Sequence, residues 1–273
     1  MEEHTLDNWQ HFEQKINELD KQRKDRLEST SLSVSDFLYR GQSDSEWHLE
    51  TTLDRFFSRN VSMRDYYHIA FMAKSKIETF TNFRWNIYSP DEYDNWLREK
   101  YDEFGGEFKP YDYFAYLRHH GFHSPLLDWT ASPYIAAFFA FNNIDRNTEY
   151  VSIYVFWEYS HGGKSAEGGE PVIRSLGPYV RSHKRHFLQQ SQYTVCTVRQ
   201  STGFFYAKHE DVIKPGVPNQ DLLWKFNIPA TERKVALKNL SRMNINAFSL
   251  FGTEDSLLET IATIDVFLRD RNL

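Results

Sequence analysis

The stretch Leu126–Phe141, with the sequence LLDWTASPYIAAFFAF, decides how this chain folds. Its second half, from Tyr134 onward, is the longest unbroken apolar run in the chain. Ser132 followed by Pro133 is typical of an N-cap and a first helical position, because a hydroxyl accepts an orphan N–H and proline needs no donor there. The stretch therefore predicts a helix that begins at Pro133. Since this helix is apolar all round, we expect it to be central.

Polar side chains stand directly before the predicted helix. Asp128, Trp129, Thr130 and Ser132 occur within five residues. Free N–H groups and the helix dipole at such an N-terminus favour an anion or a polar ligand. The alternative interpretation is that Asp128 and Thr130 only cap and brace a core helix, since polar residues are common at helix starts.

The composition is that of a globular chain rich in aromatic residues. The 273 residues include 22 Phe, 16 Tyr and 7 Trp, and the length fits one large domain or two small ones. One cysteine, Cys196, excludes an internal disulfide and a cysteine-based metal cluster. Its apolar neighbours predict a buried strand residue rather than a nucleophile.

Charge and hydropathy limit the possible partners. The net charge of −6 argues against a general nucleic-acid binder. One basic segment, Arg181–His186, could still contact such a partner or could be a solvated loop or helix face. We find no secretory signal and no apolar stretch of the roughly 18 residues that a membrane span needs. The expectation is a cytoplasmic protein without a membrane partner.

Helical periodicity dominates the first half of the chain and strand patterns dominate the second, which predicts an α+β fold with a helical N-terminal half packed on a mixed sheet. Helices are expected over 5–28, 63–84, 89–104, 110–120 and 230–242, and from 252 or 253 onward. Strands are expected over 37–39, 150–157, 193–198, 203–207, 222–228 and 247–251.

An arginine and a glycine end the first predicted strand. Arg40 follows the aromatic residues Phe37 and Tyr39, and Gly41 follows Arg40. A guanidinium can fork onto a phosphate or a carboxylate, and a glycine lets a ligand approach the backbone or lets the chain turn. The alternative is an Arg40 that pairs with a structural carboxylate such as Asp128.

Two further groups of side chains are candidates for chemistry. His119 and His123 have the spacing of metal ligands on a helix, but Gly121 between them is expected to break the helix. We therefore favour one histidine that positions a substrate, and we predict no metal. Glu254 and Asp255 begin the last helix, where acids stabilise the helix dipole and could also bond a ribose hydroxyl or stabilise a cation.

Three pieces of sequence together carry a resemblance to a known family. They are FLYRGQ at 37–42, RHHGFHSPLLDWT at 118–130 and SPYIAAFFA at 132–140. The chain resembles the FRG-domain family over about residues 33–265. Arg40 and Gly41 match the Phe/Tyr-Arg-Gly motif that names the family, and stretches at 226–230 and 249–251 resemble its C-terminal part.

The second motif of the family is matched with departures. His119, Gly121 and the run 126–130 agree with the family pattern. The departures are His120 for Tyr, His123 for Pro, Ser124 for Thr and Pro125 for Arg. The hydroxyl at 124 is kept, and the shape of this loop is left open.

The resemblance implies a fold and an activity. We expect the N-terminal helix to occupy residues 1–32 and a single FRG-type domain to follow over 33–273, and the resemblance implies a sheet core like that of ADP-ribosyltransferases. Some family members are toxins of toxin–antitoxin and phage-defence systems. The implied activity is that of an NAD-dependent ADP-ribosyltransferase toxin. The acceptor is a macromolecule, most plausibly RNA such as mRNA and otherwise protein, and an antitoxin protein is an implied partner.

The same resemblance assigns roles to residues. Arg40 would hold the NAD diphosphate or ribose, Thr130 and Ser132 would flank nicotinamide, and Glu254 or Asp255 would hold the ribose. A carboxylate there would stabilise the oxocarbenium-like cation formed as the glycosidic bond breaks. The implied NAD-binding residues are Tyr39, Arg40, Gly41, His119, Asp128, Trp129, Thr130 and Ser132, with Tyr39 or Trp129 as a ring that stacks on nicotinamide.

Two other classes of function fit the same residues. One is a non-catalytic module that binds or senses a ligand in the same pocket. The other is a hydrolase, either an NAD glycohydrolase or a nuclease.

Overall fold

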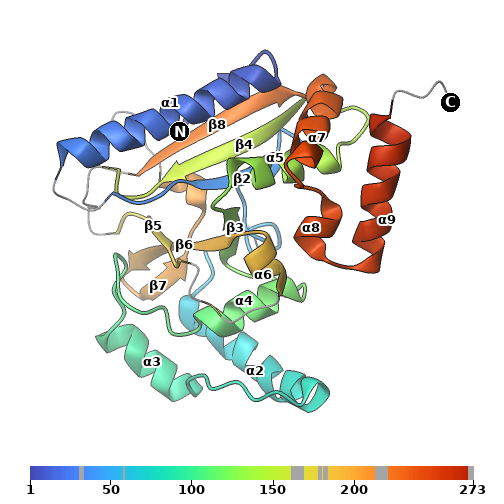
Figure 1. The fold of residues 1–273 in the computed structure, drawn as a ribbon. Helices are drawn as coiled ribbons and strands as arrows, with labels where there is room; N and C mark the ends of the chain where they lie inside the picture. The colour runs from blue at the N-terminus through green and yellow to red at the C-terminus, as the bar shows by residue number, and fades with distance from the viewer. Residues whose placement is uncertain are drawn as a thin grey trace.

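The computed structural model describes residues 1–30, 34–57, 59–160, 169–177, 180, 184–212 and 221–269. Its architecture is mixed α/β, with one eight-stranded sheet in the order β1-β8-β4-β2-β3-β6-β5 and β7 paired to β6 (Figure 1). Among the described strands, only β1 and β8 pair in parallel. The strands are β1 (Glu2–Thr5), β2 (Leu38–Gln42), β3 (Leu126–Thr130), β4 (Tyr150–Trp157), β5 (Val172–Ser175), β6 (Ser191–Gln200), β7 (Gly203–Tyr206) and β8 (Leu222–Pro229).

One face of the sheet packs against α1 (Trp9–Ser29), α5 (Pro133–Asn142) and α7 (Arg233–Arg242). The buried residues of α1 recur at spacings of three and four, which puts them on one stripe of the helix. The predicted helix over 5–28 begins later than expected, because Asn8 caps it by accepting the His11 amide at 2.9 Å. Residues 2–5 instead form β1 along β8. The division of the chain at residue 33 stays a prediction.

A second layer of helices lies below the sheet in Figure 1. It contains α2 (Met63–Thr81), α3 (Pro90–Glu99) and α4 (Tyr111–His119), which share a core with residues of β3, β6 and β7. Ser89 and Glu92 form a capping box with Pro90 at the first helical position, which confirms the predicted start of α3. The helix ends at Glu99 and does not reach Phe104.

The predicted central helix is confirmed as α5. The Ser132 hydroxyl accepts the Ile135 amide at 3.3 Å and caps it. The strand β2 runs on through Gly41, which pairs with Ile153 of β4, so a strand end at Gly41 was wrong. A Cβ at Gly41 would lie 1.9 Å from the carbonyl oxygen of Ala136, because α5 crosses β2 at this point.

The C-terminal part corrects one strand prediction. Residues 247–251 form the helix α8 (Ala247–Phe251), because Asn246 and Ser249 make a capping box and Gly252 ends the turn with φ of 61°. The Thr253 cap predicted for the last helix is confirmed at α9 (Glu254–Ala262). The remaining elements are α6 (Lys184–Leu188), the short helices η1 (His209–Asp211) and η2 (Ala230–Glu232), and η3 (Thr263–Leu268).

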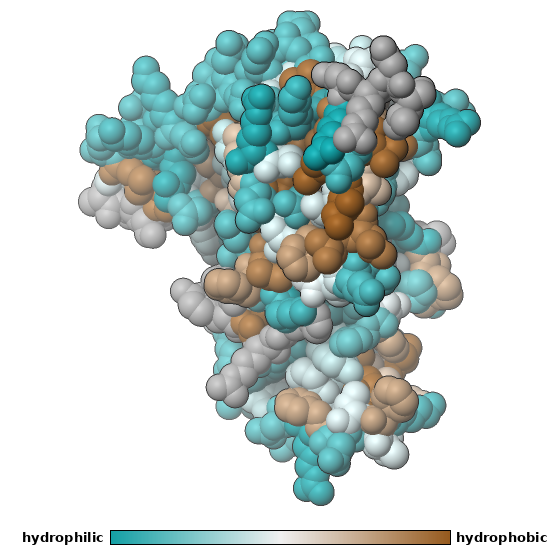
Figure 2. Space-filling model, turned by 45° about the vertical axis from the view of Figure 1, so that its right-hand side comes forward, coloured by the Kyte–Doolittle hydropathy of each residue, from teal (hydrophilic) through white to brown (hydrophobic). Residues whose placement is uncertain are grey.

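The side of the molecule that carries the C-terminal helices comes forward in Figure 2 and shows brown apolar patches. Leu258 of α9 and Val266 near the C-terminus are exposed apolar side chains. Among the described helices, none is long and apolar enough to cross a membrane. Of the basic segment Arg181–His186, residues 181–183 lie outside the described part of the chain.

Candidate functional site

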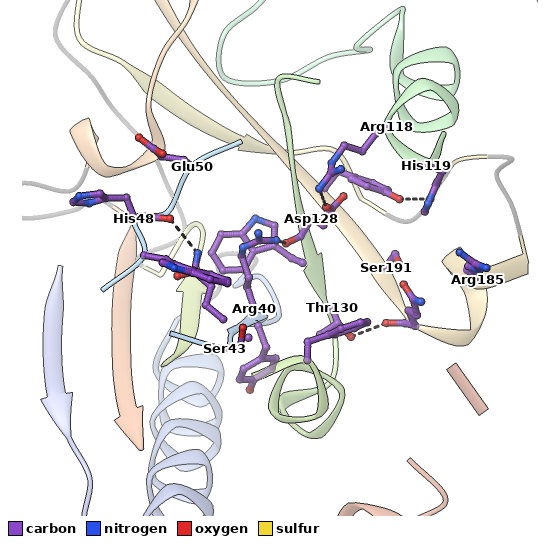
Figure 3. A pocket seen from close by; sticks show the side chains of 18 of the residues that line it. Arg40, Ser43, His48, Glu50, Arg118, His119, Asp128, Thr130, Arg185 and Ser191 are labelled. Atoms are coloured by element: carbon purple, nitrogen blue, oxygen red, sulfur yellow. Dashed lines mark hydrogen bonds and ion pairs between the residues drawn. The ribbon is translucent and has the colours of Figure 1, made fainter. Parts of the chain in front are cut away.

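The sheet opens between β2 and β3. These neighbouring strands pair at one register position, Tyr39 opposite Thr130, whereas β2 pairs with β4 at five positions. A cavity of about 710 Å³ lies at this opening, which is within the roughly 300–1,000 Å³ of small-molecule sites. In Figure 3, Arg40 stands in its middle, with His48 and Glu50 on one side and Arg118 and His119 on the other.

The cavity gathers seven of the ten predicted site residues. These are Tyr39, Arg40, Gly41, His119, Asp128, Trp129 and Thr130. Ser132 does not line the cavity, because its hydroxyl caps α5. Glu254 and Asp255 also lie outside it, exposed on the first turn of α9. The structure therefore does not bring these two acids to Arg40.

Arg40 reaches across the opening to the neighbouring strand. Its Nη1 donates to the backbone carbonyl of Asp128 at 2.7 Å, so the partner is the carbonyl and not the carboxylate. Its Nε is buried without a hydrogen-bond partner. Burial lowers the pKa of Arg40 to about 10, while the Asp128 charge acts in the opposite direction. Arg40 is therefore a cation at neutral pH.

A second arginine pairs with the carboxylate of the same residue, Asp128. Arg118, near the end of α4, forms an ion pair with the Asp128 side chain through its Nη2. Its Nε is also buried without a partner. Each buried N–H left unbonded costs roughly 1–3 kcal/mol, and hydrogen bonds between arginine and an anion are among the strong ones. Arg40 and Arg118 together can therefore bind an anionic group.

The two histidines of the predicted pair have different partners. His119 Nε2 lies 2.7 Å from the Tyr193 hydroxyl, and both residues line the cavity. Burial raises the pKa of Tyr193, so the phenol is neutral. His123 stacks on Phe56 with ring centroids 4.5 Å apart. Within the described ranges, no group of three or more His, Cys, Asp or Glu side chains could hold a metal ion.

The hydroxyl and the rings that were predicted to contact nicotinamide, those of Thr130, Trp129 and Tyr39, already contact other parts of the protein. Thr130 donates to the carbonyl of Gln189 at 2.7 Å and accepts the Ser132 amide at 3.2 Å. Trp129 and Tyr39 are each 4 % exposed, so core neighbours cover most of both rings. Trp47, at 52 % exposed, is an indole on the cavity wall that presents a large free surface.

Two walls of the cavity come from residues that were not among the predicted site residues. The segment after β2 supplies Ser43, Glu46, Trp47, His48 and Glu50. The position of this segment directly after Arg40 and Gly41 was the one sequence feature that could have pointed to it. Gln42 holds the segment in place by donating to the carbonyl of His48 at 3.1 Å, and Glu50 pairs with Lys208 at 3.0 Å.

The opposite wall comes from α6, the turn that follows it and the start of β6. It contains Arg185, Gln189, Ser191 and Tyr193. These residues arrive by strand pairing, since Thr130 lies opposite Ser191 in the antiparallel register of β3 and β6. The sequence carried a weak signal here, because Arg185 belongs to the basic segment. Among the described residues, four arginines and three carboxylates line the cavity, namely Arg40, Arg55, Arg118, Arg185, Glu46, Glu50 and Asp128.

A comparison with protein families recognises the part of the chain that builds the centre of this cavity. Residues 35–149 match the FRG domain. The FRG segment contains Arg40, Gly41 and the whole stretch 118–141, and this match supports the family resemblance. Comparisons with curated proteins and with solved structures return no match. The wall formed by residues 185–193 lies beyond the FRG segment.

Proposed function

We propose that the cavity around Arg40 binds NAD and that the protein transfers ADP-ribose from it to a macromolecule. The single observation that carries this proposal is the pair Arg40 and Arg118, whose buried Nε groups have no partner in a cavity of about 710 Å³. A diphosphate supplies the anionic oxygens that two such arginines lack. We choose NAD among the possible diphosphate ligands because the chain resembles the FRG family.

The chain offers groups for each part of the substrate. Arg40 and Arg118 would hold the diphosphate and so fix the position of the ribosyl carbon. Trp47 would stack on one of the two bases, since an exposed indole gains both contact area and ring–ring interaction there. Asp128 would keep the two guanidinium groups oriented through its carbonyl and its carboxylate.

A carboxylate inside the cavity suits the reaction better than one on α9. Glu50 lines the cavity and is anchored by Lys208. In this reaction the bond between the ribosyl carbon and nicotinamide breaks. A bond from that carbon to an acceptor oxygen or nitrogen forms, and the acceptor loses a proton. Glu50 would stabilise the positive charge that develops on the ribose. This assignment replaces the role first expected of Glu254 or Asp255.

The toxin role and the acceptor class form part of this proposal through the family resemblance. RNA is the proposed acceptor and protein the alternative, and a neutralising antitoxin is the proposed partner. Expression of the protein would then arrest cell growth. Arg40→Ala would relieve that arrest because the diphosphate loses its central cation.

The deciding experiment incubates the purified protein with adenylate-labelled NAD and total cellular RNA or total cellular protein. The variants are Arg40→Ala, Glu50→Gln and Glu254→Gln. We expect label in one pool with the wild type, and a loss of at least a hundredfold with Arg40→Ala or Glu50→Gln, as for the removal of one electrostatic group from a catalytic site. Glu254→Gln is the matched control and should label as the wild type does.

Other outcomes would replace the proposal. Free ADP-ribose without labelled acceptor would make the protein an NAD glycohydrolase. Intact NAD with a folded wild type would refute a reaction with NAD and leave a ligand-binding module. Loss of label in Glu254→Gln but not in Glu50→Gln would return the catalytic carboxylate to α9.

A further inference from the structure

A second cavity, of about 690 Å³, lies apart from the one at Arg40 and shares no lining residue with it. Its walls come from the α2–α3 connection, the α3–α4 connection and β5. Its lining is strongly aromatic and includes Phe83, Trp85, Phe108 and Tyr111. Among the described residues, three cations and two carboxylates also line it, namely Arg84, Lys109, Arg174, Glu107 and Asp112.

Arg174 of β5 is the unusual member of this lining. It is 5 % exposed, and no ion pair joins it to an acidic side chain in the described part of the protein. Its Nη1 donates to the backbone carbonyls of Asp102 and Gly105, at 2.7 and 2.5 Å. Its guanidinium carbon lies 5.6 Å from the ring centroids of Tyr101 and Phe108. A buried charge that is held by dipoles and rings alone still lacks an anionic partner.

The unbonded atoms of Arg174 form one edge of the guanidinium. Both Nε and Nη2 are buried without a hydrogen-bond partner. These two N–H groups point the same way, and this edge is the fork that takes two oxygens of one carboxylate or phosphate. Trp85 adds a third unbonded donor, its indole Nε1. Among the described residues of this cavity, all the buried side-chain groups without a hydrogen-bond partner are donors. A ligand that satisfies them must therefore supply acceptor atoms.

We propose that this second cavity binds a small ligand of the nucleoside monophosphate class. Its phosphate takes the Nε–Nη2 edge of Arg174, and its planar ring packs on the aromatic wall that contains Phe83 and Trp85. Arg84 and Lys109 add positive charge near the phosphate, although Lys109 already pairs with Glu107. The binding is independent of the chemistry proposed at Arg40.

The test uses the full-length protein labelled with 5-fluorotryptophan and followed by fluorine NMR. The chain has seven tryptophans, and the Trp85→Phe variant assigns the resonance of Trp85. The probes are AMP, adenosine and inorganic phosphate. We expect AMP to shift the Trp85 resonance saturably, with at least tenfold weaker effects from adenosine, which lacks the phosphate, and from phosphate, which lacks the ring. The resonances of Trp47 and Trp129 report binding at the other cavity.

Arg174→Lys keeps the charge but removes the two-donor edge, so AMP should bind at least tenfold more weakly. Arg199→Lys changes an exposed arginine of the neighbouring strand β6 and should leave the affinity unchanged. Should Arg174→Lys fail to fold, the double variant Arg84→Ala with Lys109→Ala replaces it. This variant removes the other two cations of the lining and should weaken AMP binding at least threefold.

Three results would overturn the proposal. One is a Trp85 resonance that millimolar AMP does not move. Another is an AMP effect on Trp47 and Trp129 alone. The third is an AMP affinity of Arg174→Lys equal to that of the wild type or, where Arg174→Lys does not fold, an equal affinity of the double variant Arg84→Ala with Lys109→Ala. An effect of phosphate equal to that of AMP would show an anion site without the ring specificity and would refute the nucleotide class.

Discussion

Replacing Gly41 by alanine tests the packing that holds the candidate site together. Gly41 lies next to Arg40 on β2, at the point where α5 crosses the strand. An added Cβ would lie 1.9 Å from the Ala136 carbonyl oxygen and 2.7 Å from the Ala140 amide nitrogen, whereas real Cβ atoms essentially never come closer than 3.0 Å. Both contacts are with helix backbone, so no side-chain rotation relieves them.

The cost follows from this geometry. Overpacking a core costs typically 1–3 kcal/mol and occasionally more. Because α5 must move as a body by about 1 Å, away from a core that is packed to crystal-like density, we place Gly41→Ala at the top of this range, about 3 kcal/mol or more. That lowers the folding equilibrium constant by a factor of more than about 100.

Urea unfolding followed by circular dichroism measures this difference. We expect a lower midpoint at an unchanged slope, since the variant alters stability and not the surface exposed on unfolding. Gly105→Ala is the matched control, because a Cβ there meets only a side-chain oxygen of Asp102 at 3.6 Å. Adding Ala136→Gly should not rescue Gly41→Ala, because the clashing atom is a carbonyl oxygen that every residue carries.

The reasoning would be refuted if Gly41→Ala unfolded within about 0.5 kcal/mol of the wild type, the range of ordinary surface substitutions. Rescue by Ala136→Gly would refute it as well. Either result would mean that α5 and β2 do not approach as closely as described, and the glycine of the Arg-Gly pair would then need another explanation.

Three further predictions concern the surroundings of the site. Burial, followed by the charge of Arg40, lowers the pKa of His209 to about 3. The unfolded chain therefore takes up a proton near pH 6.5 that the folded chain does not, and the free energy of unfolding falls as the pH drops from about 6.5 towards 3. His209→Gln should reduce this pH slope in urea titrations between pH 7 and 5. Ser132→Ala removes the cap of α5 and should cost about 1 kcal/mol by thermal unfolding, with Ser132→Asn close to neutral. Trp129→Phe loses the bond from Nε1 to Thr194 Oγ1 at 2.8 Å and should cost about 1 kcal/mol in the same assay.

The local features of the fold were predictable because they depend on residues a few positions apart. The Ser132 and Ser89 caps, the apolar stripe of α1 and the strand β4 all follow from short-range patterns. The strand predicted over 247–251 failed for a related reason. A capping box and a terminal glycine outweighed the strand tendency of a five-residue apolar run.

The candidate site was predictable in its centre and not in its walls. Arg40 and the stretch 126–130 drew attention because unusual residues stand next to one another in the sequence. Only its closeness to Arg40 in the sequence pointed to Glu50, and Tyr193 enters the cavity from a segment that no short-range pattern connects to Arg40. Glu254 and Asp255 looked suitable as acids at a helix start, but the orientation of α9 leaves them on the surface.

The sequence by itself determined that a buried apolar helix follows a cluster of polar residues, that an arginine stands beside a glycine on a short strand, and that the chain resembles the FRG family. The tertiary structure decided which side chains meet. It paired β3 with β6 and left β2 and β3 paired at one register position, Tyr39 opposite Thr130. The gap between these two strands opens the cavity that Arg40 and Arg118 line. The physical reason is that capping and periodicity act within a few residues, whereas strand register and helix crossing depend on contacts between distant segments.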